Sequence, residues 1–301
     1  MKRALTLLAG IAAAAAVATT ALAQEGTLKK IKDTGSITIG HRDASVPFSY
    51  YDDKQRPVGY AMDLCHRVVD AVKSELKMPK LEVKYQLVTS ANRIPLMANG
   101  TIDLECGSTT NNLDRQKQVG FTITHFVTAN RFVTKRSAKI GKLADLKGKT
   151  IVSTAGTTNI KQITELNGQQ NLGMNIISAN GQPEAFQMVE TGRAVAFVMD
   201  DILLYSLVAQ SRSPKDYVIS AEALSVEPYG IMLRKDDEAF KKVVDAAMTQ
   251  IYKSGQINAI YQKWFLKPIP PKNINLNVPM SAQLKKVVSN PTDSGDPADY
   301  T

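Results

Sequence analysis

The sequence predicts an α/β protein built around largely parallel sheets. Segments with the period-two apolar spacing of strands alternate with segments whose apolar residues recur every three or four positions, as on one face of a helix. The alternation occurs in two successive blocks and is typical of strands joined by crossover helices. The chain has 301 residues, of which 44% are hydrophobic and 22% are charged, a composition that suffices for two hydrophobic cores.

The N-terminus has the pattern of a secretory signal peptide. Met1-Lys2-Arg3 precedes an almost unbroken apolar run, and a stretch of small residues ends at Ala23. Cleavage after Ala23 leaves 278 of the 301 residues and lowers the net charge from +9 to +7, because Lys2 and Arg3 are removed. No second apolar run is long enough to span a bilayer. We therefore expect a protein that is exported to the periplasm.

The first block is expected to contain three strands and two helices. Apolar residues recur at helical spacing from Tyr60 until Pro79 stops the pattern. In chain order the predicted elements are a strand at 36–40, a helix at 60–76, a strand at 81–87, a short helix at 94–100 and a strand at 102–106.

The second block repeats this order. Its predicted elements are strands at 150–153, 175–178 and 194–199, with helices at 159–166, 183–191 and 202–208. A strand at 229–233, a long helix at 240–251 and a short helix ending at Trp264 and Phe265 follow. The end of the chain, 290–301, is polar enough that we expect it to be mobile.

The charge distribution, the cysteines and the histidines bear on nucleic-acid binding, disulfide formation and metal binding. The lysine and arginine clusters are short and lack interleaved aromatic residues, and export argues against nucleic acid, so we expect no nucleic-acid partner. In an oxidising compartment Cys65 and Cys106 either form a disulfide or remain two separately buried thiols. His41, His66 and His125 have no metal-ligand spacing, so no metal site is expected.

Polar residues follow several predicted strands directly. They include Arg42, Ser108, Thr110, Thr157, Thr158 and Asp200. Ligands of α/β sheets bind at the carboxyl ends of the strands, so these side chains are candidates for one binding site. A lone Arg or Ser in a loop is more often solvated than bound to a ligand, and Asp200, followed by Asp201, is equally well explained as a helix N-cap.

Ordered short motifs resemble those of one known family. They are VPFSY at 46–50, VGY at 58–60, SANRIP at 90–95, NGTID at 99–103, GSTT at 107–110, GRAVAF at 192–197, DD at 200–201, KWF at 263–265 and PIPPK at 268–272. In these motifs the chain resembles the polar amino-acid branch of the bacterial periplasmic solute-binding proteins, family 3, and within it the members that bind glutamate and aspartate.

The resemblance implies a two-lobed clam-shell of the type II class, in which each lobe is a sheet flanked by helices. One lobe would comprise residues 24–130 and 225–301, and the other residues 131–224. The protein would be a monomeric substrate-binding component of an ABC importer that delivers its ligand to the membrane permease. It would need no cofactor and no catalytic residue.

The resemblance also implies a set of ligand-binding residues. They are Arg42, Ser90, Arg93, Ser108, Thr110, Arg115, Thr157, Thr158, Gln182 and Asp200. Arg115 would hold the α-carboxylate in its planar fork, and Asp200 would accept the ammonium group. Arg42, with Ser90 and Arg93, would hold the distal carboxylate. Three arginines against Asp200 give an expected pocket charge of +2.

Arg42 favours an acidic ligand over glutamine. In similar glutamine-binding proteins an acidic residue stands at this position, because an amide needs an acceptor where a carboxylate needs donors. Gln182 stands where the family has a histidine, and its amide can still donate to a carboxylate. Because neither glutamine nor arginine titrates near neutral pH, we expect nearly constant affinity between roughly pH 5.5 and 7.5.

Two alternatives are retained. The first is a binder of another polar amino acid such as glutamine. The second is a dehydratase-like periplasmic enzyme on the same fold, which would need a general acid or base in the cleft. Glu105 and Glu184 are the glutamates expected near the site, and no neighbour that would tune Glu105 is evident.

Overall fold

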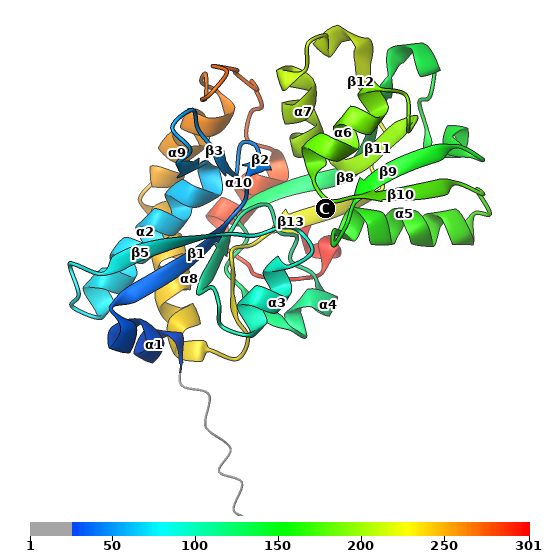
Figure 1. Cartoon of the computed structure of the whole chain (residues 1–301). Coiled ribbons are helices and arrows are strands. Elements are labelled where there is room, and N and C mark those ends of the chain that lie inside the picture. Colours follow the sequence, from blue (N-terminus) through cyan, green and yellow to red (C-terminus); the bar gives the residue numbers. More distant parts are fainter. Residues whose placement is uncertain (1–25) are drawn as a thin grey trace, which may run out of the picture.

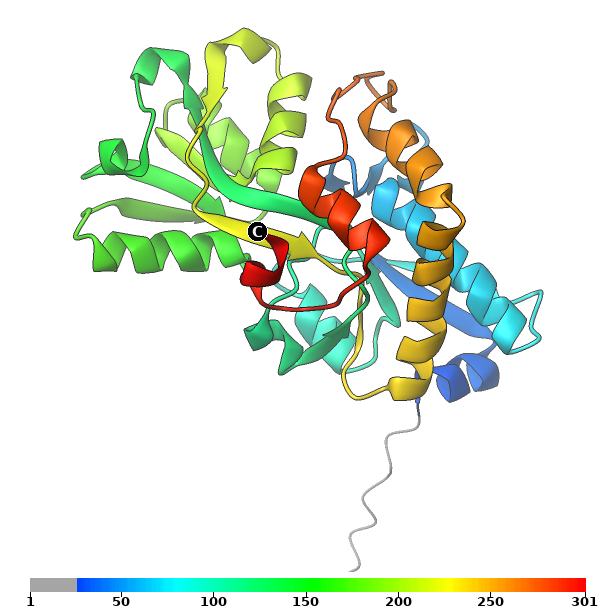
Figure 2. The same ribbon diagram turned by 180° about the vertical axis from the view of Figure 1, so that it is seen from behind.

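The computed structural model describes residues 26–301, and the predicted signal peptide at 1–23 lies outside them. The described residues form two lobes, each a sheet flanked by helices, and long strands run from one lobe into the other (Figures 1 and 2). The α/β class and the two-lobed arrangement predicted above are confirmed.

The first sheet has the strand order β5-β1-β6-β14-β7. Its strands are β1 (Ser36–His41), β5 (Glu82–Leu87), β6 (Leu104–Cys106), β7 (Val119–Phe121) and β14 (Met232–Arg234). β1 pairs in parallel with β5 and β6, whereas β14 is antiparallel to β6 and β7. The helices of this lobe are α1 (Thr27–Thr34), α2 (Tyr60–Glu75), α3 (Arg93–Ala98), α4 (Leu113–Gln116), α8 (Glu238–Lys253) and α9 (Gln256–Phe265).

A small sheet of β2 (Ala44–Ser45), β3 (Ser49–Tyr51) and β4 (Pro57–Val58) leads into α2. The loop in this sheet caps the helix, because the backbone N–H of Tyr60 donates to Pro47 O and that of Ala61 to Phe48 O. Gly59 precedes α2 at φ 139°, and a Cβ there would lie 2.2 Å from Phe48 O. Only glycine fits this close approach.

The second sheet has the strand order β10-β9-β11-β8-β12, and β13 pairs with β8. Its strands are β8 (Phe126–Lys135), β9 (Thr150–Thr154), β10 (Asn175–Ala179), β11 (Ala196–Asp200), β12 (Tyr217–Ile219) and β13 (Ser225–Tyr229). Its flanking helices are α5 (Thr158–Gln169), α6 (Gln182–Glu190) and α7 (Asp201–Gln210). β10, β9 and β11 are parallel, whereas β8 is antiparallel to β11, β12 and β13.

Two sequence-based expectations about the strands are wrong. The predicted strand at 229–233 is two strands, because β13 ends at Tyr229 in the second sheet and β14 begins at Met232 in the first. The chain changes sheets between them. The sheets are mixed rather than largely parallel, because the strands near this crossing pair antiparallel.

The C-terminal residues are also not free, contrary to expectation. Helix α10 (Ala282–Ser289) packs against α8 and β8, and the last residues return to the body of the protein (Figure 2). Tyr300 is buried, and its hydroxyl oxygen lies 2.8 Å from Thr124 Oγ1. Asn111 Nδ2 donates to Asp293 O at 2.8 Å. These hydrogen bonds attach residues 290–301 to the first lobe, although the segment is polar.

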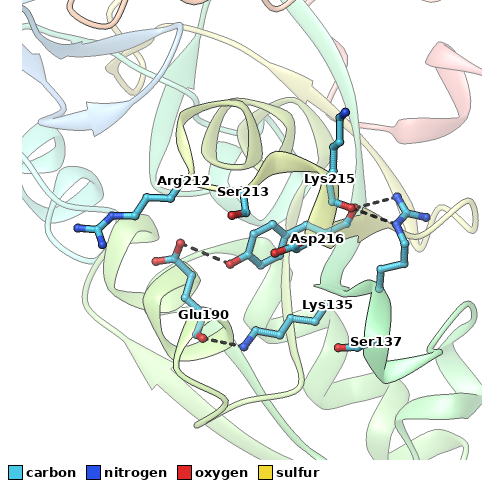
Figure 3. Close-up of a pocket in the computed structure, with 9 residues that line it drawn as sticks. Lys135, Ser137, Glu190, Arg212, Ser213, Lys215 and Asp216 are labelled. Atoms are coloured by element: carbon cyan, nitrogen blue, oxygen red, sulfur yellow. Dashed lines mark hydrogen bonds between the residues drawn. The ribbon is translucent and has the colours of Figure 1, made fainter.

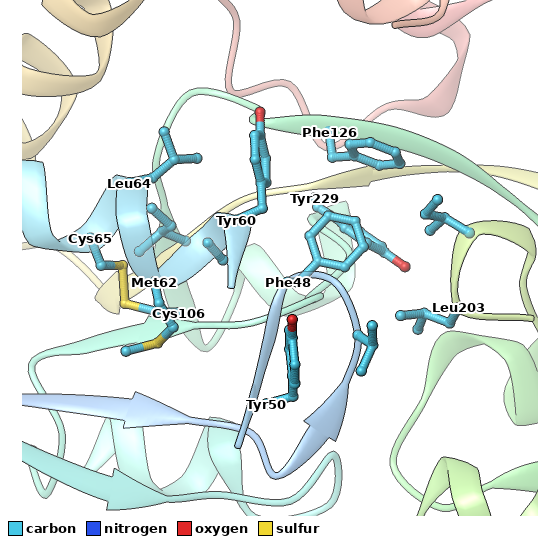
Figure 4. Close-up of a cluster of buried hydrophobic side chains, with 14 of the residues drawn as sticks. Phe48, Tyr50, Tyr60, Met62, Leu64, Cys65, Cys106, Phe126, Leu203 and Tyr229 are labelled. Carbon is cyan, nitrogen blue, oxygen red and sulfur yellow. A yellow bond between two sulfur atoms is a disulfide. The ribbon is translucent and has the colours of Figure 1, made fainter. Parts of the chain in front are cut away.

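Aromatic rings fill the core where the two lobes meet. Phe48 makes edge contacts with Tyr60, Phe126 and Tyr229, at centroid distances of 6.0, 4.9 and 5.2 Å (Figure 4). Phe126 begins β8 and Tyr229 ends β13, and the two residues are paired across these strands. The ends of the two connecting strands are therefore packed into this aromatic cluster. Such ring pairs stabilise beyond their buried area.

Of the two alternatives for the cysteines, the structure has the disulfide. Cys65 in α2 and Cys106 at the end of β6 are bonded, with Cα atoms 6.3 Å apart (Figure 4). Cys106 directly precedes the segment that carries Ser108 and Thr110. The bond therefore ties the strand that presents these residues to a buried helix.

We expect loss of this disulfide to lower the free energy of unfolding by about 4 kcal/mol, because a closed loop of this length restricts the unfolded chain. The measurement is urea denaturation of the oxidised protein, of the protein with reductant, and of the Cys65→Ala/Cys106→Ala variant. Reductant should leave the double variant unchanged. Equal unfolding midpoints for oxidised and reduced protein would contradict the expectation.

Candidate functional site

A closed cleft between the two lobes contains nearly all of the predicted binding residues. The volume open to a water-sized molecule is about 10 Å³, so the side chains of the two lobes nearly fill the cleft. Its walls are Arg42, Ser90, Arg93, Ser108, Thr110, Thr157, Thr158, Asn159, Gln182, Met199, Asp200 and Leu203. Of the ten residues predicted for ligand binding, nine line this cleft.

Several of these residues lie at or just after the carboxyl ends of strands, as predicted from the sequence. Arg42 follows β1 and Ser108 follows β6 in the first lobe, whereas Asp200 ends β11 in the second. Thr157 follows β9 and caps α5, since its hydroxyl accepts from the backbone N–H of Ile160 at 3.3 Å. The two lobes approach closely here.

One end of the cleft is rich in buried donors. Arg42 and Arg93 are 3% and 2% exposed, and Ser90 and Ser108 are also buried. Arg42 Nε and Nη1, Arg93 Nε and both serine hydroxyls have no hydrogen-bond partner among the described residues. Burial, followed by repulsion from Arg93, lowers the pKa of Arg42 to about 10, so Arg42 stays charged at neutral pH. Buried donors without partners suit an anionic ligand group.

Arg115 lies beside the cleft, in α4, and is outside the set of residues that form its walls. Its Nη1 donates to Thr110 O at 2.8 Å and its Nη2 to Gly156 O at 3.2 Å. Burial, followed by repulsion from Arg93, lowers its pKa to about 10. Arg115 thus joins the two lobes, and its contact with the α-carboxylate stays a prediction.

Asp200 provides the acidic group of the cleft. It is 3% exposed, and its Oδ1 accepts from Asn159 Nδ2 at 2.7 Å while its Oδ2 accepts from the Tyr229 hydroxyl. Burial, followed by the charge of Glu227, raises its pKa to about 7. Asp200 occupies the N-cap position of α7, but its side chain makes no cap bond. Its side chain instead belongs to the cleft.

Two buried carboxylates change the expected charge of the site. Glu105 and Glu227 are 0% and 1% exposed. Together with Asp200 they balance the three arginines, so the expectation of +2 is wrong and the formal sum is zero. Glu105 also has a hydrogen-bond partner in the structure, since Thr109 Oγ1 donates to its Oε2 at 2.6 Å.

Sequence reasoning missed Glu227 together with Asn159 and Tyr229. Glu227 accepts from Thr158 Oγ1 at 3.0 Å and from Gln162 Nε2 at 2.6 Å. The sequence feature that could have revealed it is a glutamate among the apolar residues of a strand, as with Glu105 in β6 and Glu227 in β13. It points to a buried carboxylate that needs partners.

The remaining candidates lie as expected. Gln182 begins α6, is buried and lines the cleft. His41 is buried outside it, with Nδ1 3.1 Å from Arg42 O and its ring against Tyr51. His41 therefore contributes no group to the cleft.

A larger hollow lies on the second lobe but contains none of the predicted residues (Figure 3). Its charged groups are mostly exposed and several are already paired, for example Lys135 Nζ with Glu190 O and the Tyr217 hydroxyl with Glu190 Oε1. Within residues 26–301, no group of three or more His, Cys, Asp or Glu residues could hold a metal ion. No helix in that range is long and apolar enough to cross a membrane.

Comparison with known proteins gives consistent matches. The model of the bacterial extracellular solute-binding proteins, family 3, matches residues 37–267. The L-glutamate/L-aspartate-binding protein of Pseudomonas aeruginosa is 53% identical over 296 residues, 97% of this chain and 98% of that protein. The glutamate/aspartate import solute-binding protein of Escherichia coli is 47% identical over 290 residues, 96% and 95% of the two chains.

Among solved structures, an ancestral arginine-binding protein bound to arginine is similar, with a TM-score of 0.69 and 27% sequence identity. The match covers 77% of this chain and 98% of that chain. Similarity to the relatives thus extends over nearly the whole chain, and similarity to the solved structure over most of it.

Proposed function

Because the chain belongs to the bacterial extracellular solute-binding proteins of family 3, we propose that it captures glutamate or aspartate for import. It is the substrate-binding component of an ABC transporter, and it delivers the amino acid from its interlobe cleft to the membrane permease. The names of two relatives at 53% and 47% identity support this function.

The observation that carries the proposal is that one cleft contains both unpartnered cationic donors and a buried carboxylate. Unpartnered donors of Arg42, Arg93 and Ser90 lie in its walls, and the buried carboxylate of Asp200 lies there as well. An acidic amino acid has a distal carboxylate for the donors and an ammonium group for the acceptor. Glutamine would leave part of the donor set without an anion, which favours the acidic ligand.

The α-carboxylate is the third group that needs a site. We assign it to Arg115 with the hydroxyls of Ser108, Thr110, Thr157 and Thr158. A guanidinium has five N–H donors, and the two bonds of Arg115 to backbone carbonyls leave others for a ligand. Those two bonds also hold its fork in one orientation.

Binding without chemistry is supported over the dehydratase-like alternative. The relatives are named as binding proteins of import systems. Glu105 is outside the cleft wall, hydrogen-bonded to Thr109, and its charge acts on Arg93, while Glu184 is exposed on α6. Neither glutamate is therefore placed to act as a general acid or base on a ligand in the cleft.

The remaining parts of the proposal concern organisation and location. We assign residues 24–130 and 225–301 to one lobe and residues 131–224 to the other, with β8 and β13 as the connection between them. The protein acts as a monomer in the periplasm after cleavage of residues 1–23. Its macromolecular partner is the permease of the importer.

We expect glutamate or aspartate to raise the melting temperature by about 10 °C at a ligand concentration a thousandfold above Kd, because binding stabilises the folded state by about 4 kcal/mol. Glutamine, lysine and leucine should have much smaller effects. Differential scanning fluorimetry with each amino acid provides the measurement. An increase in melting temperature with leucine or lysine as large as that with glutamate would contradict the proposal of an acidic ligand.

Arg115→Ala should weaken glutamate and glutamine alike, by at least roughly a hundredfold, because both ligands share the α-carboxylate. Arg42→Gln should weaken glutamate far more than glutamine, since it removes a charge facing the distal group. Calorimetric titration of both ligands measures the difference. Arg67→Gln, an exposed change on α2, is the matched control. Normal glutamate binding by Arg42→Gln would place the distal group elsewhere.

The raised pKa of Asp200 replaces the expectation of constant affinity. The ammonium group needs an ionised partner, so ligand binding releases a proton from Asp200 at acidic pH. Glutamate should therefore bind roughly twentyfold more weakly at pH 5.5 than at pH 7.5, with a plateau above about pH 8. Calorimetry at fixed ionic strength measures this.

Glu227→Gln removes the charge that helps to raise the pKa of Asp200, so it should move the rise in affinity to lower pH. An unchanged affinity between pH 5.5 and 7.5 in the unmodified protein would show that Asp200 is ionised throughout. That result would support the sequence-based expectation of nearly constant affinity over this pH range.

A further inference from the structure

Glu105 lies among the arginines of the cleft, yet its carboxylate is not required by any ligand group. It projects from β6 and is completely buried. Its Oε2 accepts from Thr109 Oγ1 at 2.6 Å, and the same hydroxyl accepts from Arg93 Nη1 at 2.6 Å. A continuous chain of hydrogen bonds therefore joins the Glu105 carboxylate to the Arg93 guanidinium.

The second oxygen of Glu105 lies beside Arg42. Oε1 has no hydrogen-bond partner among the described residues. A Cβ on Gly107 would lie 2.4 Å from this oxygen and 3.2 Å from Arg42 Cγ, so the carboxylate occupies the space next to the Arg42 side chain. Glycine at position 107 leaves this space to the carboxylate, since any Cβ there would collide with it.

The placement has an electrostatic consequence. The charge of Glu105 favours the protonated form of both Arg42 and Arg93, against burial that lowers the pKa of each. Two neighbouring guanidiniums buried without an anion would be costly. With Glu105 present, the protein can fold around them before a ligand arrives.

We propose that Glu105 is a built-in counter-ion that sets how strongly the cleft prefers an acidic amino acid to its neutral amide. It holds Arg93 through Thr109 and offsets one of the two positive charges that face the distal group. The ligand carboxylate then meets one net positive charge at this end instead of two. This inference rests on the proposed function, because it requires the distal group to lie against Arg42 and Arg93.

A stabilising ion pair alone would have a different consequence. If Glu105 only supported the fold, its replacement would change the free energy of unfolding and leave the ratio of the two ligand affinities unchanged. A counter-ion at the distal group must change that ratio, because glutamate carries a distal charge and glutamine does not. The ratio of affinities is therefore the decisive readout.

The principal variant is Glu105→Gln, which keeps the length of the side chain and an acceptor for Thr109. Removal of one negative charge near the distal group should raise the ratio of the glutamine Kd to the glutamate Kd by roughly tenfold. Titration calorimetry of the unmodified and variant proteins with both amino acids at fixed pH and ionic strength measures this ratio. An unchanged or lower ratio overturns the proposal.

Two matched variants separate position from charge. Glu184→Gln makes the same chemical change on the exposed surface of α6 and should leave the ratio unchanged, because solvent screens it. Glu227→Gln removes a buried carboxylate beside Asp200 and should change the affinity for both ligands by the same factor, since both carry the ammonium group. A tenfold rise in the ratio for either variant would assign the effect to net charge and overturn a local role for Glu105.

Thr109→Val provides a second test if Glu105→Gln does not fold. It breaks the hydrogen-bond chain from Glu105 to Arg93 without altering any charge, and the Arg93 guanidinium, no longer held toward Glu105, should bind glutamate better relative to glutamine, as in Glu105→Gln. An unchanged ratio there overturns the proposal. Failure of the unmodified protein to bind any acidic amino acid would refute the proposed function itself, and the inference with it.

Discussion

Three guanidinium groups buried at one interlobe cleft are the constraint on which the rest of the structure depends. Charges can be buried in a protein only where counter-charges and hydrogen bonds accompany them. Glu105, Asp200 and Glu227 supply the counter-charges, each from a different strand. The parallel strands bring their carboxyl ends to one edge in each lobe, and the two edges face each other across the cleft.

The strands between the lobes join this charge balance to the fold. Tyr229 ends β13, packs in the aromatic cluster on Phe48 and donates its hydroxyl to Asp200 of the other lobe. Glu227, two residues earlier, accepts from Thr158 and Gln162 of α5. The connecting strand therefore contacts the acidic side of the site directly.

The first lobe is the more firmly anchored support for the donors. The disulfide ties β6 to α2, the loop at Phe48 caps the same helix, and Tyr300 closes over Thr124. None of these groups lines the cleft. They hold the strand ends that present Arg42 and Ser108, so that unpartnered donors keep their positions without a ligand to orient them.

The sequence by itself determined the alternation of strands and helices, the polar strand ends and the preference for donors implied by Arg42, because periodicity and residue chemistry are local properties. Tertiary structure decided what depends on residues far apart in the chain. It buried Glu105 and Glu227 where their charges act on Arg115, left Arg115 out of the cleft wall and moved the chain from one sheet to the other after Tyr229. Burial and the distances between charges set these outcomes, and neither is encoded within any single segment.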